Sequence, residues 1–94
     1  MRRKDDGGHA WTGGGVERAV IRIVRHLSPG FARRPITKNT RLHQDLGWDE
    51  WYPLRVVKPI RTTLHEALED RVVLGLRTVG DLVSCVWSAM EVRA

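Results

Sequence analysis

The sequence is poor in the residues that would build a covalent framework or a metal centre. It has a single cysteine, Cys85, so no disulfide can form within the chain and no pair of thiolates is available to a metal ion. The histidines match no zinc-binding spacing, because they are scattered over the chain at His9, His26, His43 and His65. The sequence therefore predicts no metal site.

Long apolar runs are also missing. No stretch approaches the roughly 20 apolar residues that a membrane-spanning helix needs. Residues 1–6 are mostly charged and lack the apolar centre of a secretion signal. We therefore predict no membrane span and a cytoplasmic location.

Length and charge narrow the function classes. A chain of 94 residues with 41% hydrophobic content forms one domain with a modest core. Enzymes with deep clefts are rarely this short, so we predict that the protein is not an enzyme and has no catalytic residues. The excess of 16 Lys and Arg over 11 Asp and Glu permits an acidic partner, which could be a protein, a nucleic acid or an anionic lipid.

The N-terminal stretch differs in composition from the rest. Residues 1–15 contain five glycines, charges of both signs and a single tryptophan, Trp11. Such a composition is flexible and offers little apolar surface to bury. We therefore predict a disordered tail over residues 1–15 and one folded domain over residues 16–94.

Apolar residues recur at helical spacing at both ends of this domain, and each series predicts a helix with one buried face. The first series comprises Val16, Ala19, Val20, Ile23, Val24 and Leu27. It stops at Ser28-Pro29-Gly30, where the proline and the glycine end a helix. The last series comprises Val79, Leu82, Val83, Val86 and Met90. We expect the two faces to be buried together, with Ile23 and Val83 in the core.

A long loop should follow the first helix. Residues 28–48 show no sustained period, and they contain two prolines and two glycines. Isolated apolar residues would pin this loop to the core, namely Phe31, Ile36, Leu42 and Leu46. Loops of this length are uncommon in small domains unless they belong to the fold or to its function.

A second helix is predicted from Asp49, which is a suitable N-cap, and Glu50 would add favourable negative charge to its first turn. Pro53 is tolerated near a helix start, whereas Pro59 removes a hydrogen bond and predicts a kink between residues 55 and 59.

A short helix around residues 70–74 should lead to a last helix. Thr78 can cap this last helix, with Asp81 three residues further on as in a capping box. The predicted class is all-α.

Two motifs connect this plan with a known family. Residues 40–51 read Thr-Arg-Leu-His-Gln-Asp-Leu-Gly-Trp-Asp-Glu-Trp, and residues 78–83 read Thr-Val-Gly-Asp-Leu-Val. Both motifs, and the order helix, long loop, helix, short helix, helix, resemble the acyl carrier proteins over residues 16–90. The resemblance implies an acyl-carrier-protein-like bundle of three to four helices with a long loop after helix one.

The chain departs from the family at the residue that matters most for carrier chemistry. Where the family has the serine that carries phosphopantetheine, this sequence has Glu50. A carboxylate offers no hydroxyl for the phosphodiester, and its charge opposes an incoming phosphate. Ser28, Ser84 and Ser88 do not lie at this helix start. We therefore predict no phosphopantetheine and no other cofactor; Glu50 either imitates a phosphoserine or, more simply, interacts with the helix dipole.

The charge of helix two also departs from the family, whose members usually present carboxylates there to basic enzymes. Here Arg55, Lys58 and Arg61 supply positive charge, which favours an acidic protein surface, for example on a fatty-acid or polyketide pathway enzyme. The predicted partner-binding residues are Trp48, Asp49, Arg55, Lys58 and Arg61. Of the two tryptophans, the family analogy assigns Trp51 to the core and leaves Trp48 to the interface.

The leading hypothesis is thus an atypical acyl-carrier-protein-like adaptor that binds protein and carries no phosphopantetheine. The alternative is a basic nucleic-acid-binding helical module using the residues Arg33, Arg34, Lys38 and Arg41 together with helix two, although this loop lacks interleaved aromatic residues for base stacking. A third possibility is a bundle that holds a free lipid in its core. Cys85 lies in an apolar helix and is interpreted as buried and inert.

Overall fold

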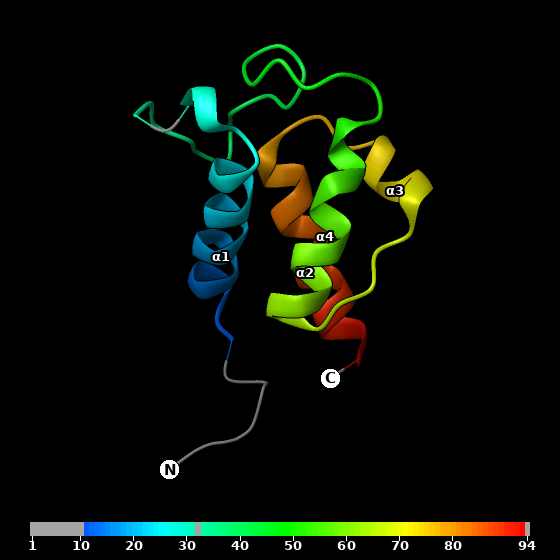
Figure 1. Cartoon of the computed structure of the whole chain (residues 1–94). Helices are drawn as coiled ribbons and strands as arrows, with labels where there is room; N and C mark the ends of the chain where they lie inside the picture. The colour runs from blue at the N-terminus through cyan, green and yellow to red at the C-terminus, as the bar shows by residue number, and fades with distance from the viewer. Residues whose placement is uncertain (1–10, 32, 94) are drawn as a thin grey trace.

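The computed structural model describes residues 11–31 and 33–93, and its regular secondary structure is helical (Figure 1). The elements in chain order are α1 (Gly13–His26), η2 (Pro29–Phe31), η3 (Tyr52–Val56), α2 (Val57–Leu64), α3 (Asp70–Leu74) and α4 (Val79–Arg93), where η marks a 3-10 helix. An isolated antiparallel bridge joins Arg41 to Thr78. The all-α prediction is confirmed.

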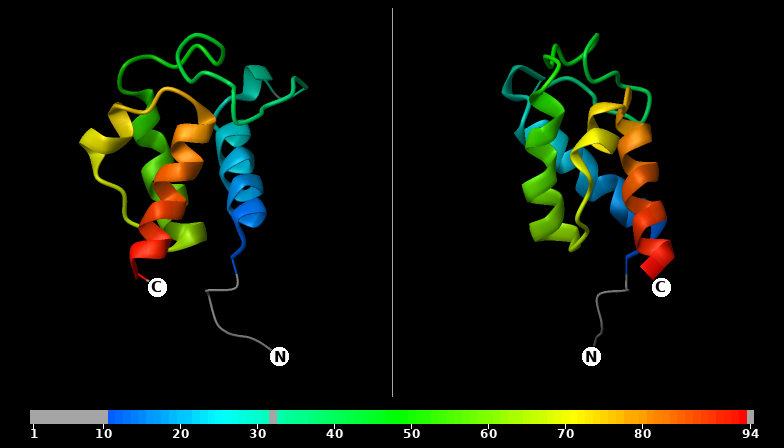
Figure 2. Two further views of the ribbon diagram at one scale, coloured as in Figure 1. Left: turned by 180° about the vertical axis from the view of Figure 1, so that it is seen from behind. Right: turned by 90° about the vertical axis from the view of Figure 1, so that its right-hand side faces the viewer.

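The three longer helices form a bundle. Helices α1, α2 and α4 run side by side, and α1 points in the opposite direction to the other two (Figures 1 and 2). The long loop after α1 crosses one end of the bundle, and the short helix α3 lies at its side near the same end. The predicted bundle with a long loop after helix one is therefore the observed fold.

Helix α1 begins earlier than the sequence predicted. The side chain of Thr12 accepts a hydrogen bond of 3.0 Å from the backbone N–H of Gly15, which is N-cap geometry that offsets the poor helix propensity of the glycines. Trp11 packs against the core. The predicted tail is thus wrong for residues 13–15, which are helical, while residues 1–10 lie outside the described residues.

Helix α4 begins with the predicted capping arrangement. The Thr78 hydroxyl accepts from the N–H of Asp81 at 3.0 Å, and the Asp81 carboxylate accepts from the N–H groups of Arg77 (3.0 Å) and Thr78 (3.1 Å). These backbone hydrogen bonds lower the pKa of Asp81. The reciprocal bonds satisfy N–H groups that a helix start otherwise leaves without partners.

The core lies mainly between α1 and α4, which share the largest helix–helix contact, and α2 closes it. Its buried apolar residues are Val16, Val20, Ile23, Val24, Ile36, Leu42, Trp48, Val56, Ile60, Leu64, Leu68, Val73, Val79, Leu82 and Val86. Ile23 is in the core as predicted, whereas Val83 is only partly buried and its neighbour Leu82 is the fully buried residue. No helix in the described part of the chain is both long and apolar enough to cross a membrane.

The predicted kink in helix two takes the form of a change in helix type. Residues 52–56 form the 3-10 helix η3, and the α-helix starts only at Val57. Pro59 is then the third residue of α2, where its missing N–H would have had no partner within the helix. The α-helix therefore begins at a position where Pro59 destabilises it least. It ends at Leu64; the N–H of His65 still bonds the carbonyl of Arg61, and the left-handed backbone of His65 (φ 60°) then turns the chain away from the helix.

The long loop is fastened to the start of α4 by backbone hydrogen bonds. Leu42 N–H donates to the carbonyl of Arg77 at 2.9 Å, and Val79 N–H donates to the carbonyl of Thr40 at 2.9 Å. Gly80 N–H donates to the carbonyl of Lys38 at 2.8 Å. The loop is therefore held at several points along its length.

The approach at Gly80 leaves no room for a side chain. A Cβ at this position would lie 2.9 Å from the carbonyl oxygen of Lys38. We expect Gly80→Ala to lower the free energy of unfolding by about 1 kcal/mol, because crowding against backbone costs about 1–3 kcal/mol and outweighs the gain of about 1 kcal/mol in helix propensity. Urea unfolding followed by circular dichroism measures this difference.

Gly14→Ala is the matched control, since Gly14 is also the second residue of its helix. A Cβ there meets only the end of the flexible Arg18 side chain, at 3.5 Å. This variant should be as stable as the wild type or more stable. Equal stability of the two variants would contradict a tight contact between the loop and α4.

Candidate protein-binding site

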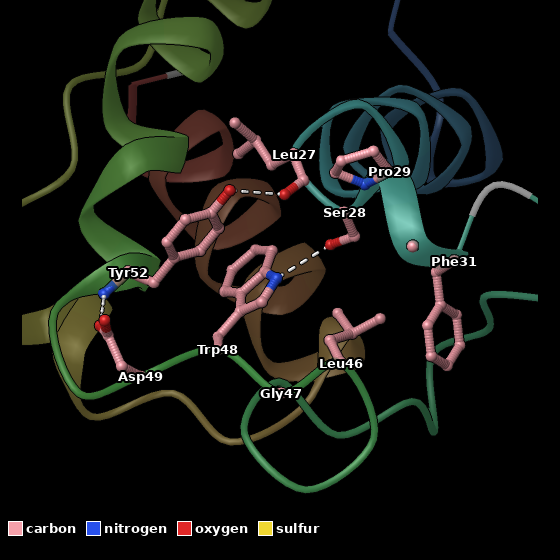
Figure 3. Close-up of a pocket in the computed structure, with 10 residues that line it drawn as sticks. Leu27, Ser28, Pro29, Phe31, Leu46, Gly47, Trp48, Asp49 and Tyr52 are labelled. Carbon is pink, nitrogen blue, oxygen red and sulfur yellow. Dashed lines mark hydrogen bonds between the residues drawn. The ribbon is translucent and has the colours of Figure 1, made fainter.

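The junction between the long loop and η3 is organised around Trp48. This residue is 6% exposed, and its indole N–H donates a hydrogen bond of 2.8 Å to the hydroxyl of Ser28 (Figure 3). Its own N–H bonds the carbonyl of Leu42, and its carbonyl lies 2.9 Å from Nδ1 of His43. The backbone and the ring of Trp48 are therefore both fixed, and His43 has a partner that the sequence did not reveal.

Tyr52 continues this arrangement into η3. Its ring lies 5.1 Å from the Trp48 ring at 59°, and its hydroxyl donates to the carbonyl of Leu27 at 2.7 Å. The carboxylate of Asp49 accepts from the N–H groups of Trp51 (2.9 Å) and Tyr52 (2.8 Å). Asp49 thus bonds the backbone at the start of η3, but it is not the N-cap that the sequence predicted, because Trp51 occupies that position.

A pocket of about 460 Å³ opens between the end of α1 and this junction (Figure 3). The lining residues are Leu27, Ser28, Pro29, Gly30, Phe31, Leu46, Gly47, Trp48, Asp49 and Tyr52. Its wall combines three aromatic rings and two leucines with polar groups, among them Ser28 and Asp49.

The roles predicted for the two tryptophans are exchanged. Trp48, expected at the interface, is buried, whereas Trp51, expected in the core, is 61% exposed. Trp51 lies in the bend before η3, which starts only at Tyr52, and so it is not on a helix face that packs against the core. Ser28 also supplies the acceptor that allows the Trp48 indole to be buried.

Glu50 is exposed and lies in the bend before η3. The sequence placed it in the first turn of a helix, and this is wrong because neither η3 nor α2 has an acidic residue in its first turn. Its charge is therefore outside the helix rather than part of its first turn.

The three basic residues of helix two are exposed as predicted. Arg55 lies on η3, and its guanidinium carbon is 5.1 Å from the centre of the Tyr52 ring, a cation–π contact. Lys58 and Arg61 follow on α2. We call these three residues the basic face. Of the predicted partner-binding residues, Asp49 and the basic face are exposed and Trp48 is not.

Of the four basic loop residues, Arg33 is exposed and the other three have separate local contacts. Arg41 donates two side-chain hydrogen bonds to Asp45 (3.2 and 3.0 Å), and bonds from the Arg41 side chain and backbone lower the pKa of Asp45. Lys38 lies 4.0 Å from Glu17, and Arg34 stacks on Phe31. Positive charge in this loop is thus divided among local partners, which does not favour a phosphate-binding surface.

Cys85 is partly buried rather than fully buried. Burial raises the pKa of its thiol, so the thiolate is less populated at neutral pH than in an exposed cysteine. This agrees with its interpretation as an unreactive residue.

A helical bundle with a loop across one end, and with Asp-Leu-Gly-Trp-Asp at the junction of that loop with helix two, is acyl-carrier-protein-like in both sequence and fold. The chain is 29% identical to the mitochondrial acyl carrier protein of Saccharomyces cerevisiae over an alignment of 76 residues that covers 78% of the chain. It spans 61% of the length of that protein, which by its name is an acyl carrier. No protein-family model and no solved structure matches the chain.

Proposed function

We propose that this protein is a non-carrier adaptor, which keeps the acyl-carrier-like bundle but binds an acidic protein surface instead of holding phosphopantetheine. The observation that carries the proposal is Glu50, which is exposed in the bend where the related family has its modified serine. The surroundings of Glu50 support the loss of carrier chemistry, and the basic face supports a change of partner.

Attachment of phosphopantetheine requires a nucleophilic hydroxyl at this junction, and the hydroxyls nearby are engaged. The Ser28 hydroxyl is buried and accepts from Trp48, and the Tyr52 hydroxyl donates to the carbonyl of Leu27. Residues 46–51 contain no serine, threonine or tyrosine. The exposed group at the attachment position is therefore a carboxylate.

The charge of helix two supports an acidic partner. Residues 55–61 contain three basic residues and no acidic one. A positive surface of this kind repels the basic docking patches that suit ordinary carrier proteins and attracts carboxylates, which raises the rate of encounter. A fatty-acid or polyketide pathway enzyme with an acidic docking patch is one such partner.

The loss of carrier function is tested with coenzyme A and a broadly acting phosphopantetheinyl transferase. The intact mass of the wild-type protein should stay unchanged, because Glu50 provides no acceptor oxygen of the required kind. Electrospray mass spectrometry measures the result. A gain of one phosphopantetheine, mapped to any residue, would contradict the proposal.

Glu50→Ser provides the comparison in the same assay. Modification of this variant, with the wild type unmodified, would show that the junction still fits the transferase and that only the hydroxyl is missing. A genuine acyl carrier protein in the same reaction confirms that the transferase is active. If the variant stays unmodified, the basic face is the expected cause, because it opposes a positively charged transferase.

A further inference from the structure

Trp51 is an exposed aromatic residue that the fold does not use. Among the large hydrophobic residues in the described part of the chain, only Trp51 (61%) and Val72 (42%) count as exposed. Tryptophan and arginine are the residues that most often dominate protein–protein binding energy, since they combine a large contact area with polar contacts. Trp51 lies four residues before Arg55, the first residue of the basic face.

Two parts of this surface, the backbone at Trp51 and the side chain of Arg55, are held in place before any partner arrives. Asp49 accepts from the N–H of Trp51 at 2.9 Å and so fixes its backbone. Arg55 rests on the ring of Tyr52, which is itself held by its hydroxyl bond to Leu27. A preformed surface loses little conformational entropy on binding, which favours affinity.

The spacing of charges indicates the shape of the partner. Arg55, Lys58 and Arg61 follow at intervals of three residues along η3 and α2. Carboxylates three or four residues apart lie on one side of a helix and can face such a row. Glu50 precedes Trp51 and would repel a partner carboxylate placed near it. The partner's acidic residues should therefore lie only on the other side of Trp51, where the basic face is.

We infer that Trp51 is the anchor of a docking surface for an acidic amphipathic helix of another protein, whose apolar residues cover Trp51 while its carboxylates pair with the basic face. This inference rests on the proposed function, because it uses the same basic face. An anionic membrane fits less well, since Val56, Ile60 and Leu64 of this helix are buried in the core and leave no apolar face to insert.

The test is selection from a displayed library of random linear peptides with the full chain as bait. Selected peptides should be enriched in Asp and Glu together with Leu, Met or Phe at helical spacing. Affinity of a dye-labelled selected peptide is then measured by fluorescence anisotropy. Trp51→Ser should weaken binding at least tenfold, while the matched control Val72→Ser, at the other exposed hydrophobic residue, should change it less than twofold.

The variants separate this inference from the proposed function. Retained affinity in Trp51→Ser with loss in Lys58→Glu would overturn Trp51 as anchor and leave the acidic-partner proposal intact. If neither variant changes the affinity, or if the selected peptides lack acidic residues, the Trp51 anchor and the acidic-partner proposal are both overturned. The last measurement mixes the protein with vesicles of phosphatidylcholine and phosphatidylglycerol, at a salt concentration that releases the selected peptide. If the protein still sediments with the vesicles, the inference is overturned in favour of membrane binding.

Discussion

Leu82→Asp is expected to unfold the protein at room temperature. Leu82 is 1% exposed on the face of α4 that packs against the core, so the new carboxylate would be buried without a partner. Burying an unpaired charge and losing the apolar contact should together lower the free energy of unfolding by on the order of 5 kcal/mol. That loss is comparable with the whole stability of many small domains. Circular dichroism and thermal unfolding measure it.

The matched control is Ser84→Asp, which introduces the same carboxylate at an exposed position of the same helix. Its stability should stay within about 0.5 kcal/mol of the wild type. A Leu82→Asp protein that melts at the wild-type temperature would show that the buried face of α4 has been assigned wrongly.

The two neighbouring tryptophans should respond oppositely to truncation. Trp48→Ala removes a buried ring that contacts Tyr52 and leaves the Ser28 hydroxyl without its donor, so a loss of about 3–5 kcal/mol is expected. Trp51→Ala removes an exposed ring and should cost less than about 0.5 kcal/mol. Urea unfolding of the two single variants gives both values.

Trp48→Phe adds a finer comparison, because it keeps an aromatic ring but removes the indole N–H that donates to Ser28. It should fall between the wild type and Trp48→Ala. A destabilised Trp51→Ala protein beside a stable Trp48→Ala protein would restore the assignment that the family analogy suggested and refute the arrangement in Figure 3.

Features that depend on neighbours in the sequence could be predicted, and features that depend on distant residues could not. The buried faces of α1 and α4 follow from apolar spacing, and the capping of α4 follows from Thr78 and Asp81 three residues apart. The exposure of the basic face could be predicted because charged side chains are rarely buried in a small core.

The exchange of Trp48 and Trp51 had no local signal. Asp49 and Pro53 are both compatible with a helix that starts at Asp49, and nothing near them in the sequence shows that a bend continues through Trp51 before η3 starts at Tyr52. The acceptor for the Trp48 indole is Ser28, twenty residues earlier, and only the folded loop brings the two together. The same holds for the contact of His43 with the carbonyl of Trp48.

The attachment of the long loop to α4 has a consequence for the order of events during synthesis of the chain. Backbone partners for Lys38, Thr40 and Leu42 are supplied by residues 77–80, close to the C-terminal end of the described chain. A nascent chain that has exposed only α1, the loop and α2 lacks these partners, so its loop is held only by contacts with earlier residues, such as the bond from the Trp48 indole to Ser28. The loop should therefore reach its final arrangement only after the start of α4 has emerged from the ribosome.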